Sequence, residues 1–212
     1  GPRRGAALAH RAWGHGNRPG VDRWLRGADV VHGTNFVVPP SRRCARVMTI
    51  HDCSFVRHPQ WSSSAVLAME PAVRRAIGNG AWVHTPSAFT AAEVIELLGA
   101  DPRRVTVVAH GVPRLSDSSG LGVSIGVRGL IEDSPYILAI GAIEPRKNLH
   151  RLVVAFGELA SHTPDVSLVI AGADGPARPA VDAAIDSLPP DIKARVVLTG
   201  YVNEATRAAL LR

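Results

Sequence analysis

The sequence has 212 residues, of which 46% are hydrophobic and 20% are charged, a balance typical of a soluble α/β protein with one large or two modest domains. No apolar run reaches the roughly 18 residues that a membrane-spanning helix needs, and the first residues lack the apolar centre of a signal peptide. A formal net charge of +6 favours an anionic partner, such as a phosphate ester, a nucleic acid or an acidic lipid headgroup. These features predict a cytoplasmic protein, or one whose localisation signal lies outside this sequence.

Short runs rich in β-branched residues alternate with helical patterns in the first half of the chain. The runs are mostly continuous and apolar, as in strands that are covered on both faces. Strands are predicted at residues 28–33, 45–52, 81–87 and 104–111, and helices at 63–78 and 87–99. Alternating strands and helices indicate a parallel sheet.

The helix at 87–99 has the clearest boundaries. Thr90 and Glu93 have the spacing of a capping box, and Gly99 suits the position just after a helix. Ser87 also favours a position at or before the start of this helix, because its side chain can accept a hydrogen bond from the first turn.

Residues 114–134 are rich in Ser and Gly without a consistent period, which predicts a linker. A second series follows, with strands at 136–141, 167–172 and 195–200 and helices at 148–160, near 177–187 and from 203 onward. The predicted fold is therefore α/β, with two Rossmann-like, doubly wound parallel-sheet domains at 1–113 and 135–212. Both domains look incomplete, because few strands are present and the sequence stops inside a helix.

Three strands of the second domain end in glycine, at Gly141, Gly172 and Gly200. Glycine at the carboxyl end of a parallel strand permits a sharp turn and close approach of a ligand, and open α/β sheets bind ligands at that edge.

The two cysteines, Cys44 and Cys53, flank a predicted strand. A strand rises about 3.3 Å per residue, so the two sulfur atoms are expected too far apart for a disulfide. We expect two reduced thiols. A structural zinc site is not expected, since the chain has no CxxC motif.

Two cations, Arg146 and Lys147, directly precede the helix predicted at 148–160. A helix N-terminus carries about half a positive charge and several unpaired N–H groups, so cations there are unfavourable unless an anion binds. A diphosphate fits, because Arg grips phosphate oxygens bidentately, Lys adds a mobile charge and the helix N–H groups complete the site. The alternative is a solvated loop in which Glu144 balances Arg146, a surface pair worth at most about 1 kcal/mol.

The segment "ILAIGAIEPRKNLHRLVVAFGEL" closely resembles the donor-site segment of retaining glycosyltransferases of family 4, which have the GT-B fold and include many mannosyltransferases. Five further segments resemble that family in its order and spacing: "DVVHGTNFVVPP", "MTIHDCSFVRHP", "VHTPSAFTAAEVIELLGADPRRVTVVAHGVP", "LVIAGADG" and "VVLTGYV". Together the matches cover nearly all of residues 28–212.

The resemblance implies transfer of a hexose, with mannose the leading candidate, from GDP-mannose or another nucleotide-diphosphate hexose to a glycan or lipid-linked saccharide. Arg146 and Lys147 would bind the diphosphate and stabilise the leaving group, which needs no metal ion if two cations are fixed in place. No tightly bound cofactor is expected, and no DxD-like metal motif stands near a strand end.

The resemblance also implies roles for other residues. His51, at the end of a strand in the first domain, would face the transferred sugar, whereas its residue type alone is equally consistent with a structural capping histidine. Gly141 lies in the donor segment, and Gly172, Tyr201 and Val202 would hold the nucleoside. His32 is at least as consistent with structural hydrogen bonding, and no role is assigned to His84. His110 stands where relatives often carry Asn, which leaves its role open.

A Glu-x7-Glu segment, which these enzymes usually carry in the second domain, is absent from these 212 residues, so turnover by this chain alone is not expected. The alternative function is a non-catalytic nucleotide- or polyanion-binding module. The positive charge also suggests peripheral association with the inner face of an acidic membrane. Nucleic-acid binding is disfavoured, since aromatic residues are only 5% and no recognised motif occurs, and NAD binding is disfavoured because no GxGxxG is present.

Overall fold

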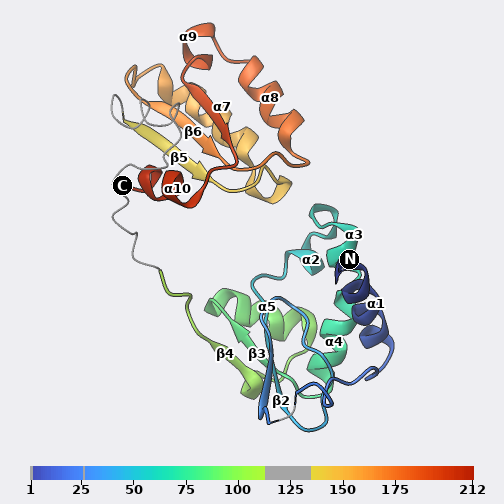
Figure 1. Ribbon diagram of the computed structural model, residues 1–212. Coiled ribbons are helices and arrows are strands. Elements are labelled where there is room, and N and C mark those ends of the chain that lie inside the picture. Colours follow the sequence, from blue (N-terminus) through green and yellow to red (C-terminus); the bar gives the residue numbers. More distant parts are fainter. Residues whose placement is uncertain (1, 26, 113–134) are drawn as a thin grey trace. The chain divides into compact units, whose positions relative to one another are not determined.

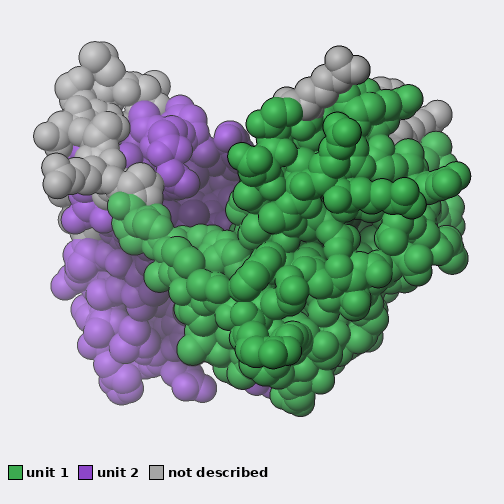
Figure 2. Space-filling view, turned by 90° about the horizontal axis from the view of Figure 1, so that it is seen from below, with its two compact units in different colours: residues 1–112 green, residues 113–212 purple. Residues whose placement is uncertain are grey.

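The computed structural model describes residues 2–25, 27–112 and 135–212 (Figure 1). The chain divides into two compact units, residues 1–112 and 113–212 (Figure 2). Each unit has its own parallel sheet and its own hydrophobic core. The segment predicted as a linker, residues 114–134, lies outside the described residues.

The first unit is built on a four-stranded parallel sheet. Its strands lie side by side in sequence order: β1 Val30–Gly33, β2 Ala45–Thr49, β3 Trp82–Thr85 and β4 Val105–Val107. All four predicted strands are present, each shorter than its apolar run. Because the strands are parallel, the residues that follow them meet at one edge of the sheet.

The helices of the first unit are α1 Pro2–His15, α2 Ser54–Arg57, α3 Ser64–Leu67, α4 Glu70–Gly78 and α5 Ala88–Leu98, with 3-10 turns η1 Pro59–Trp61 and η2 Pro102–Arg104. The sequence analysis did not predict α1, which lies beside α4 (Figure 1). The single helix predicted at 63–78 is two helices. Pro71 is the reason, since proline lacks an N–H and its ring clashes with the preceding turn, so it is accommodated in the first turn of α4.

Helix α5 begins one turn earlier than its predicted capping box. The N-cap residue is Ser87, whose Oγ atom accepts a hydrogen bond of 3.1 Å from the Thr90 N–H. The capping-box prediction for Thr90 was wrong, because Thr90 lies buried inside the helix. Gly99 ends the helix in the left-handed conformation, with φ of +69°, as predicted.

The core of the first unit lies between β2, α4 and α5, which contribute the fully buried side chains of Met48, Val73 and Val94. Each such side chain contributes about 1.5–3 kcal/mol through the hydrophobic effect. Cys44 and Cys53 are buried free thiols, which confirms the prediction that they do not pair.

The second unit contains a three-stranded parallel sheet in sequence order, β5 Tyr136–Ile140, β6 Ser167–Ala171 and β7 Val196–Gly200. Its helices are α7 Leu149–Ala160, α8 Arg178–Asp186, α9 Pro190–Lys193 and α10 Glu204–Leu210, and the 3-10 turn η3 Pro145–Lys147 precedes α7. The predicted order of elements is confirmed, and the fold class is α/β.

Helix α7 buries the face that its apolar spacing predicts. Leu149, Val153, Phe156 and Ala160 are all buried, and they form the main cluster of the core with residues of β6 and α8. The opposite face is exposed, as at Arg151, Val154 and Glu158.

Among the described residues, no helix is long and apolar enough to cross a membrane.

Candidate functional site

The three strand-end glycines of the second unit lie side by side. The Gly141 N–H donates a hydrogen bond of 2.7 Å to the Ala171 carbonyl, and the Gly172 N–H donates one of 2.8 Å to the Gly200 carbonyl. A Cβ atom on Gly172 would lie 2.2 Å from the Gly141 carbonyl oxygen, so only glycine fits there. The sequence analysis attributed these glycines to a ligand, and the structure shows that close packing of the chain already requires Gly172.

Lys147 reaches over the end of β5. Its Nζ atom lies 3.4 Å from the Ile140 carbonyl oxygen, and the side chain passes across Gly141. No carboxylate of the described residues lies within salt-bridge distance of this ammonium group. Lys147 therefore brings an unpaired positive charge to the edge where the glycines meet.

Arg146 is paired locally. Its Nε atom donates a hydrogen bond of 2.8 Å to Glu144 Oε2, and the two side chains are 48% and 40% exposed. This is the contact that the solvated-loop alternative predicts. An exposed pair of this kind contributes about 0–1 kcal/mol, so separating Arg146 from Glu144 costs little.

The start of α7 has no side-chain cap. Its N-cap residue, Asn148, adopts the left-handed conformation with φ of +54°, and its side chain makes no hydrogen bond to the first turn. By contrast, Ser87 caps α5 and Asn203 caps α10 through side-chain oxygens. The first turn of α7 thus keeps N–H groups for an anion, next to Arg146 and Lys147.

Tyr201 and Val202 follow β7 at the same edge and differ in exposure. Tyr201 is 83% exposed and available to a ligand. Val202 is half-buried and packs against Val169, Ala171 and Leu210.

In the first unit, four histidines meet at the carboxyl edge of the sheet. His51 follows β2, and its Nε2 atom lies 3.0 Å from the Thr34 carbonyl oxygen. Its Nδ1 atom lies 3.3 Å from Nε2 of His110, which follows β4. The ring centroids of His84, in β3, and His110 are 6.0 Å apart.

Thr49, at the end of β2, links the rings of His32 and His84. Its buried hydroxyl lies 2.8 Å from His32 Nε2 and 2.9 Å from His84 Nδ1. The sequence analysis gave His84 no role and left His110 open. The parallel order of the strands could have revealed the cluster, because each histidine lies in the last residues of a strand or just after it.

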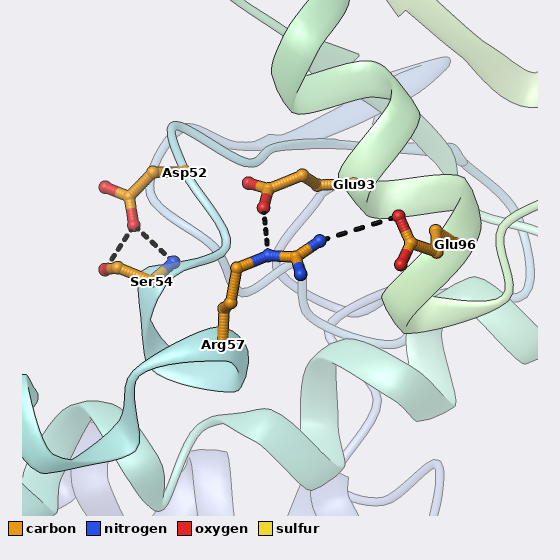
Figure 3. Close-up of polar contacts among 5 residues, drawn as sticks. All are labelled: Asp52, Ser54, Arg57, Glu93 and Glu96. Carbon is orange, nitrogen blue, oxygen red and sulfur yellow. Dashed lines mark hydrogen bonds and ion pairs between the residues drawn. The ribbon is translucent and has the colours of Figure 1, made fainter.

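Polar contacts order the turn after β2 and hold helix α2 against α5 (Figure 3). The Asp52 carboxylate accepts hydrogen bonds from the N–H and hydroxyl of Ser54, at 2.9 and 2.5 Å, so it caps its own turn. Arg57 donates from Nε to Glu93 at 2.6 Å and lies 3.5 Å from Glu96. The hydrogen bond with Glu93 raises the pKa of Arg57, so this guanidinium stays charged and fixes α2 on α5.

Cys53 lies next to this turn but is not a nucleophile. Burial and the nearby carboxylate of Glu93 raise the pKa of the thiol to about 12, which keeps it protonated at neutral pH. Among the described residues, no group of three or more His, Cys, Asp or Glu side chains has the arrangement of a metal site.

A cavity of about 300 Å³ lies at the other end of the first sheet. Arg18, Arg42 and Arg46 line it together with Asp22. Arg46 is near the start of β2, whereas His51 follows its end, so this cavity is separate from the histidine cluster.

Two family descriptions match the chain. Glycosyltransferase Family 4 matches residues 2–114, more than half of the sequence, and Glycosyl transferases group 1 matches residues 125–212. The chain belongs to glycosyltransferase family 4. A relative of this family 4 chain, O-antigen chain mannosyltransferase B of Escherichia coli, is 28% identical over 137 residues, which are 63% of the chain and 36% of that protein.

Solved structures resemble the family 4 chain in fold. The Anabaena protein Alr3699/HepE, in complex with UDP and glucose, has a TM-score of 0.58 at 17% identity over 86% of the chain. WaaG, a glycosyltransferase involved in lipopolysaccharide biosynthesis, has a TM-score of 0.58 at 17% identity over 87% of the chain. The chain spans about half the length of these structures, at 50% and 51%. These likenesses confirm the Rossmann-like GT-B fold class.

Proposed function

We propose that this family 4 chain is part of a glycosyltransferase that transfers a hexose, with mannose the leading candidate, from a nucleotide-diphosphate sugar to a glycan or lipid-linked saccharide with retention of configuration. The second unit binds the donor, and the first unit faces the acceptor. Supporting this proposal, the family match covers more than half of the chain, and the E. coli relative is named as a mannosyltransferase.

The main support for the proposed donor site is the ammonium group of Lys147, which has no carboxylate partner among the described residues and lies beside the uncapped first turn of α7. An isolated cation next to the positive end of a helix is unfavourable until an anion arrives. A diphosphate supplies two charged groups, which matches Lys147 together with the Arg146 guanidinium once Glu144 is displaced. Gly141 and Gly172 place no side chain at this edge, and Gly172, Tyr201 and Val202 hold the nucleoside.

In the reaction, the bond between the anomeric carbon of the hexose and the diphosphate oxygen breaks, and that oxygen keeps the electron pair. A hydroxyl oxygen of the acceptor forms the new bond to the anomeric carbon, and the hydroxyl proton passes to the departing diphosphate oxygen. Arg146 and Lys147 stabilise the negative charge that develops on the leaving diphosphate, a role that two fixed cations can fill without a metal ion. His51 belongs to the acceptor side, where its turn is fixed through Arg57 and Glu93.

Localisation in the cytoplasm, at the inner membrane face when the acceptor is lipid-linked, is consistent with the net charge of +6. The candidate donor bases are guanine, in keeping with the mannosyltransferase relative, and uracil, since UDP is bound in the Anabaena structures.

Calorimetric titration with GDP, UDP and ADP tests the donor site. We expect Arg146→Ala and Lys147→Ala each to weaken diphosphate binding by about 1–3 kcal/mol, the usual cost of losing a charge-assisted contact. Lys193→Ala is the matched control, because it removes the same charge from the same unit at a lysine paired with Asp186. Unchanged affinity in both Arg146→Ala and Lys147→Ala contradicts the proposed site.

A further inference from the structure

The cavity of about 300 Å³ near the start of β2 has a surplus of positive charge in its lining. Three arginines line it, Arg18, Arg42 and Arg46, together with one carboxylate, Asp22, which leaves a net charge of +2. No carboxylate of the described residues lies within salt-bridge distance of these three guanidinium groups. Their charges are therefore not paired within the described part of the chain.

The Asp22 carboxylate is engaged by the segment that precedes β2. Its Oδ1 atom accepts a hydrogen bond of 2.5 Å from the Ser41 hydroxyl and bonds of 3.0 and 3.1 Å from the N–H groups of Arg42 and Arg43. The bond from Ser41 is the main cause that lowers the pKa of Asp22, so this carboxylate stays ionised at neutral pH. Asp22 thus orders one wall of the cavity and leaves the guanidinium groups to another anion.

Arg46 is the half-buried arginine of the cavity. It is the second residue of β2, and one terminal nitrogen of its guanidinium donates to the Asn79 carbonyl. A guanidinium has several N–H donors, and the others of Arg46 have no partner among the described residues. Burial lowers the pKa of Arg46, because it removes water from the charge and no carboxylate takes its place. An anion in the cavity would restore the interactions that this charge has lost.

Arg18 and Arg42 are exposed and come from two different connections. Arg18 lies between α1 and β1, and Arg42 lies between β1 and β2. Arg42 uses its backbone N–H to bind Asp22, whereas neither guanidinium group makes a hydrogen bond with a described residue. Both side chains can therefore turn toward a ligand that Arg46 holds.

The connection that carries Arg18 is fixed before any ligand binds. The Trp13 indole N–H, on α1, donates a hydrogen bond of 2.9 Å to the Pro19 carbonyl. The Val21 N–H donates one of 3.1 Å to the Pro40 carbonyl, on the opposite wall. A site with ordered walls loses less conformational entropy when its ligand binds.

We propose that this cavity binds the phosphate group of a phosphate monoester, contacted by Arg46, Arg18 and Arg42. A phosphate monoester carries a charge of about −1.5 to −2 at pH 7, which balances the surplus of the lining. Its oxygens also suit the bidentate geometry of guanidinium groups. The cavity volume of about 300 Å³ is at the lower end of the range for small-molecule sites, which leaves room for a small organic group beside the phosphate.

The ester is either a soluble metabolite or a lipid headgroup, because both present the same chemical group. The site lies at the opposite end of the first sheet from the histidine cluster, and it does not depend on the proposed function.

The soluble form is tested by calorimetric titration of the 212-residue chain with glycerol 3-phosphate, with glycerol as the uncharged control. The titration is made in the Arg146→Ala/Lys147→Ala double variant, so that the proposed donor site contributes no phosphate binding. We expect glycerol 3-phosphate to bind with one site per chain and glycerol not to bind.

Single substitutions in the same background identify the residues. We expect Arg46→Gln to weaken binding of glycerol 3-phosphate about tenfold and Arg42→Gln about threefold, because each removes a charge-assisted contact. Arg103→Gln is the matched control, since it removes the same charge from the first unit at a guanidinium already paired with Asp101. The control should keep its affinity within about twofold.

Vesicles distinguish a lipid-borne ester from a soluble one. Phosphatidic acid in phosphatidylcholine vesicles presents a phosphate monoester, whereas phosphatidylglycerol at matched surface charge presents a diester and measures the general attraction of a chain with a net charge of +6. Stronger co-flotation with phosphatidic acid that is lost in Arg46→Gln indicates a lipid ligand. Equal co-flotation with both vesicles, together with binding of glycerol 3-phosphate, indicates a soluble one.

Two results overturn the phosphate site. The first is absence of glycerol 3-phosphate binding together with equal co-flotation with the two kinds of vesicle. The second is an affinity that is unchanged in Arg46→Gln and Arg42→Gln, or that falls equally in Arg103→Gln. If Arg46→Gln fails to fold, the exposed Arg42 still decides through Arg42→Gln. Because the background lacks Arg146 and Lys147, failure of nucleotide binding elsewhere leaves these results unchanged.

Discussion

The ammonium group of Lys147 occupies the space that a side chain at position 141 would fill: a Cβ atom on Gly141 would lie 1.7 Å from Lys147 Nζ. The two residues are therefore coupled. The lysine can cross the end of β5 only because the strand ends in glycine, and the glycine has φ of +131°, which other residues rarely adopt.

Gly141→Ala should displace Lys147 and strain the backbone. We expect the free energy of unfolding to fall by about 1–3 kcal/mol, the usual cost of an unfavourable backbone conformation, and the affinity for a nucleoside diphosphate to fall about tenfold. Denaturant unfolding and calorimetry measure the two effects. Gly78→Ala is the control, since its Cβ atom meets no neighbour and helix α4 tolerates alanine. Full affinity in Gly141→Ala would show that the position of Lys147 is unimportant for binding.

Glu144→Gln should strengthen diphosphate binding. The substitution removes a carboxylate that competes for Arg146 at 2.8 Å and repels an incoming anion. Since an exposed pair contributes about 0–1 kcal/mol, we expect a gain of about two- to fivefold in affinity at low salt, fading at high salt. Glu158→Gln, on the same unit, changes the charge equally and serves as control. Weaker binding by Glu144→Gln would indicate that Glu144 itself contacts the ligand.

Val153→Ala and Val154→Ala test the orientation of α7. Val153 is fully buried and Val154 is 49% exposed. Removing buried methyl groups leaves a cavity, so Val153→Ala should cost about 2 kcal/mol of unfolding free energy, and Val154→Ala should change it by less than about 0.5 kcal/mol. Urea unfolding of the two variants measures the difference. Equal losses of unfolding free energy in the two variants would contradict the burial of Val153 and the exposure of Val154.

Asp101 should contribute to the pH dependence of stability. The hydrogen bond from the Arg103 side chain lowers the pKa of Asp101 to about 2 in the folded protein, below the ordinary 3.8. A lowered pKa means that the ionised form is favoured by folding, so its contribution is complete above about pH 4 and is lost as the pH falls toward 2. Asp101→Asn should flatten the pH dependence of unfolding in that window.

The Asp101 carboxyl resonance, followed by NMR, should titrate near pH 2 in the folded chain. A midpoint near the ordinary value would contradict the contact with Arg103.

The order of strands and helices and some helix ends were determined by the sequence alone, because they depend on hydrophobic spacing and on the conformational preferences of single residues. The strand and helix order of both units follows from hydrophobic period, which depends only on which residues must be buried. Gly99 ends α5 as predicted, because its left-handed conformation costs other residues energy whatever surrounds them. Ser87 caps α5, as its residue type predicted, whereas the capping-box spacing wrongly favoured Thr90. Periodicity also failed at Pro71, which divides a helix that the apolar pattern made continuous.

Only the tertiary structure decided which side chains meet. Arg146 and Lys147 are neighbours with the same charge, yet one pairs with Glu144 and the other crosses Gly141 unpaired, because the 3-10 turn before α7 points them differently. His51 and His110 are 59 residues apart and come together because parallel strands end at one edge. Sequence patterns fix burial residue by residue, whereas hydrogen-bond partners and free lone pairs depend on which strand ends the sheet places side by side.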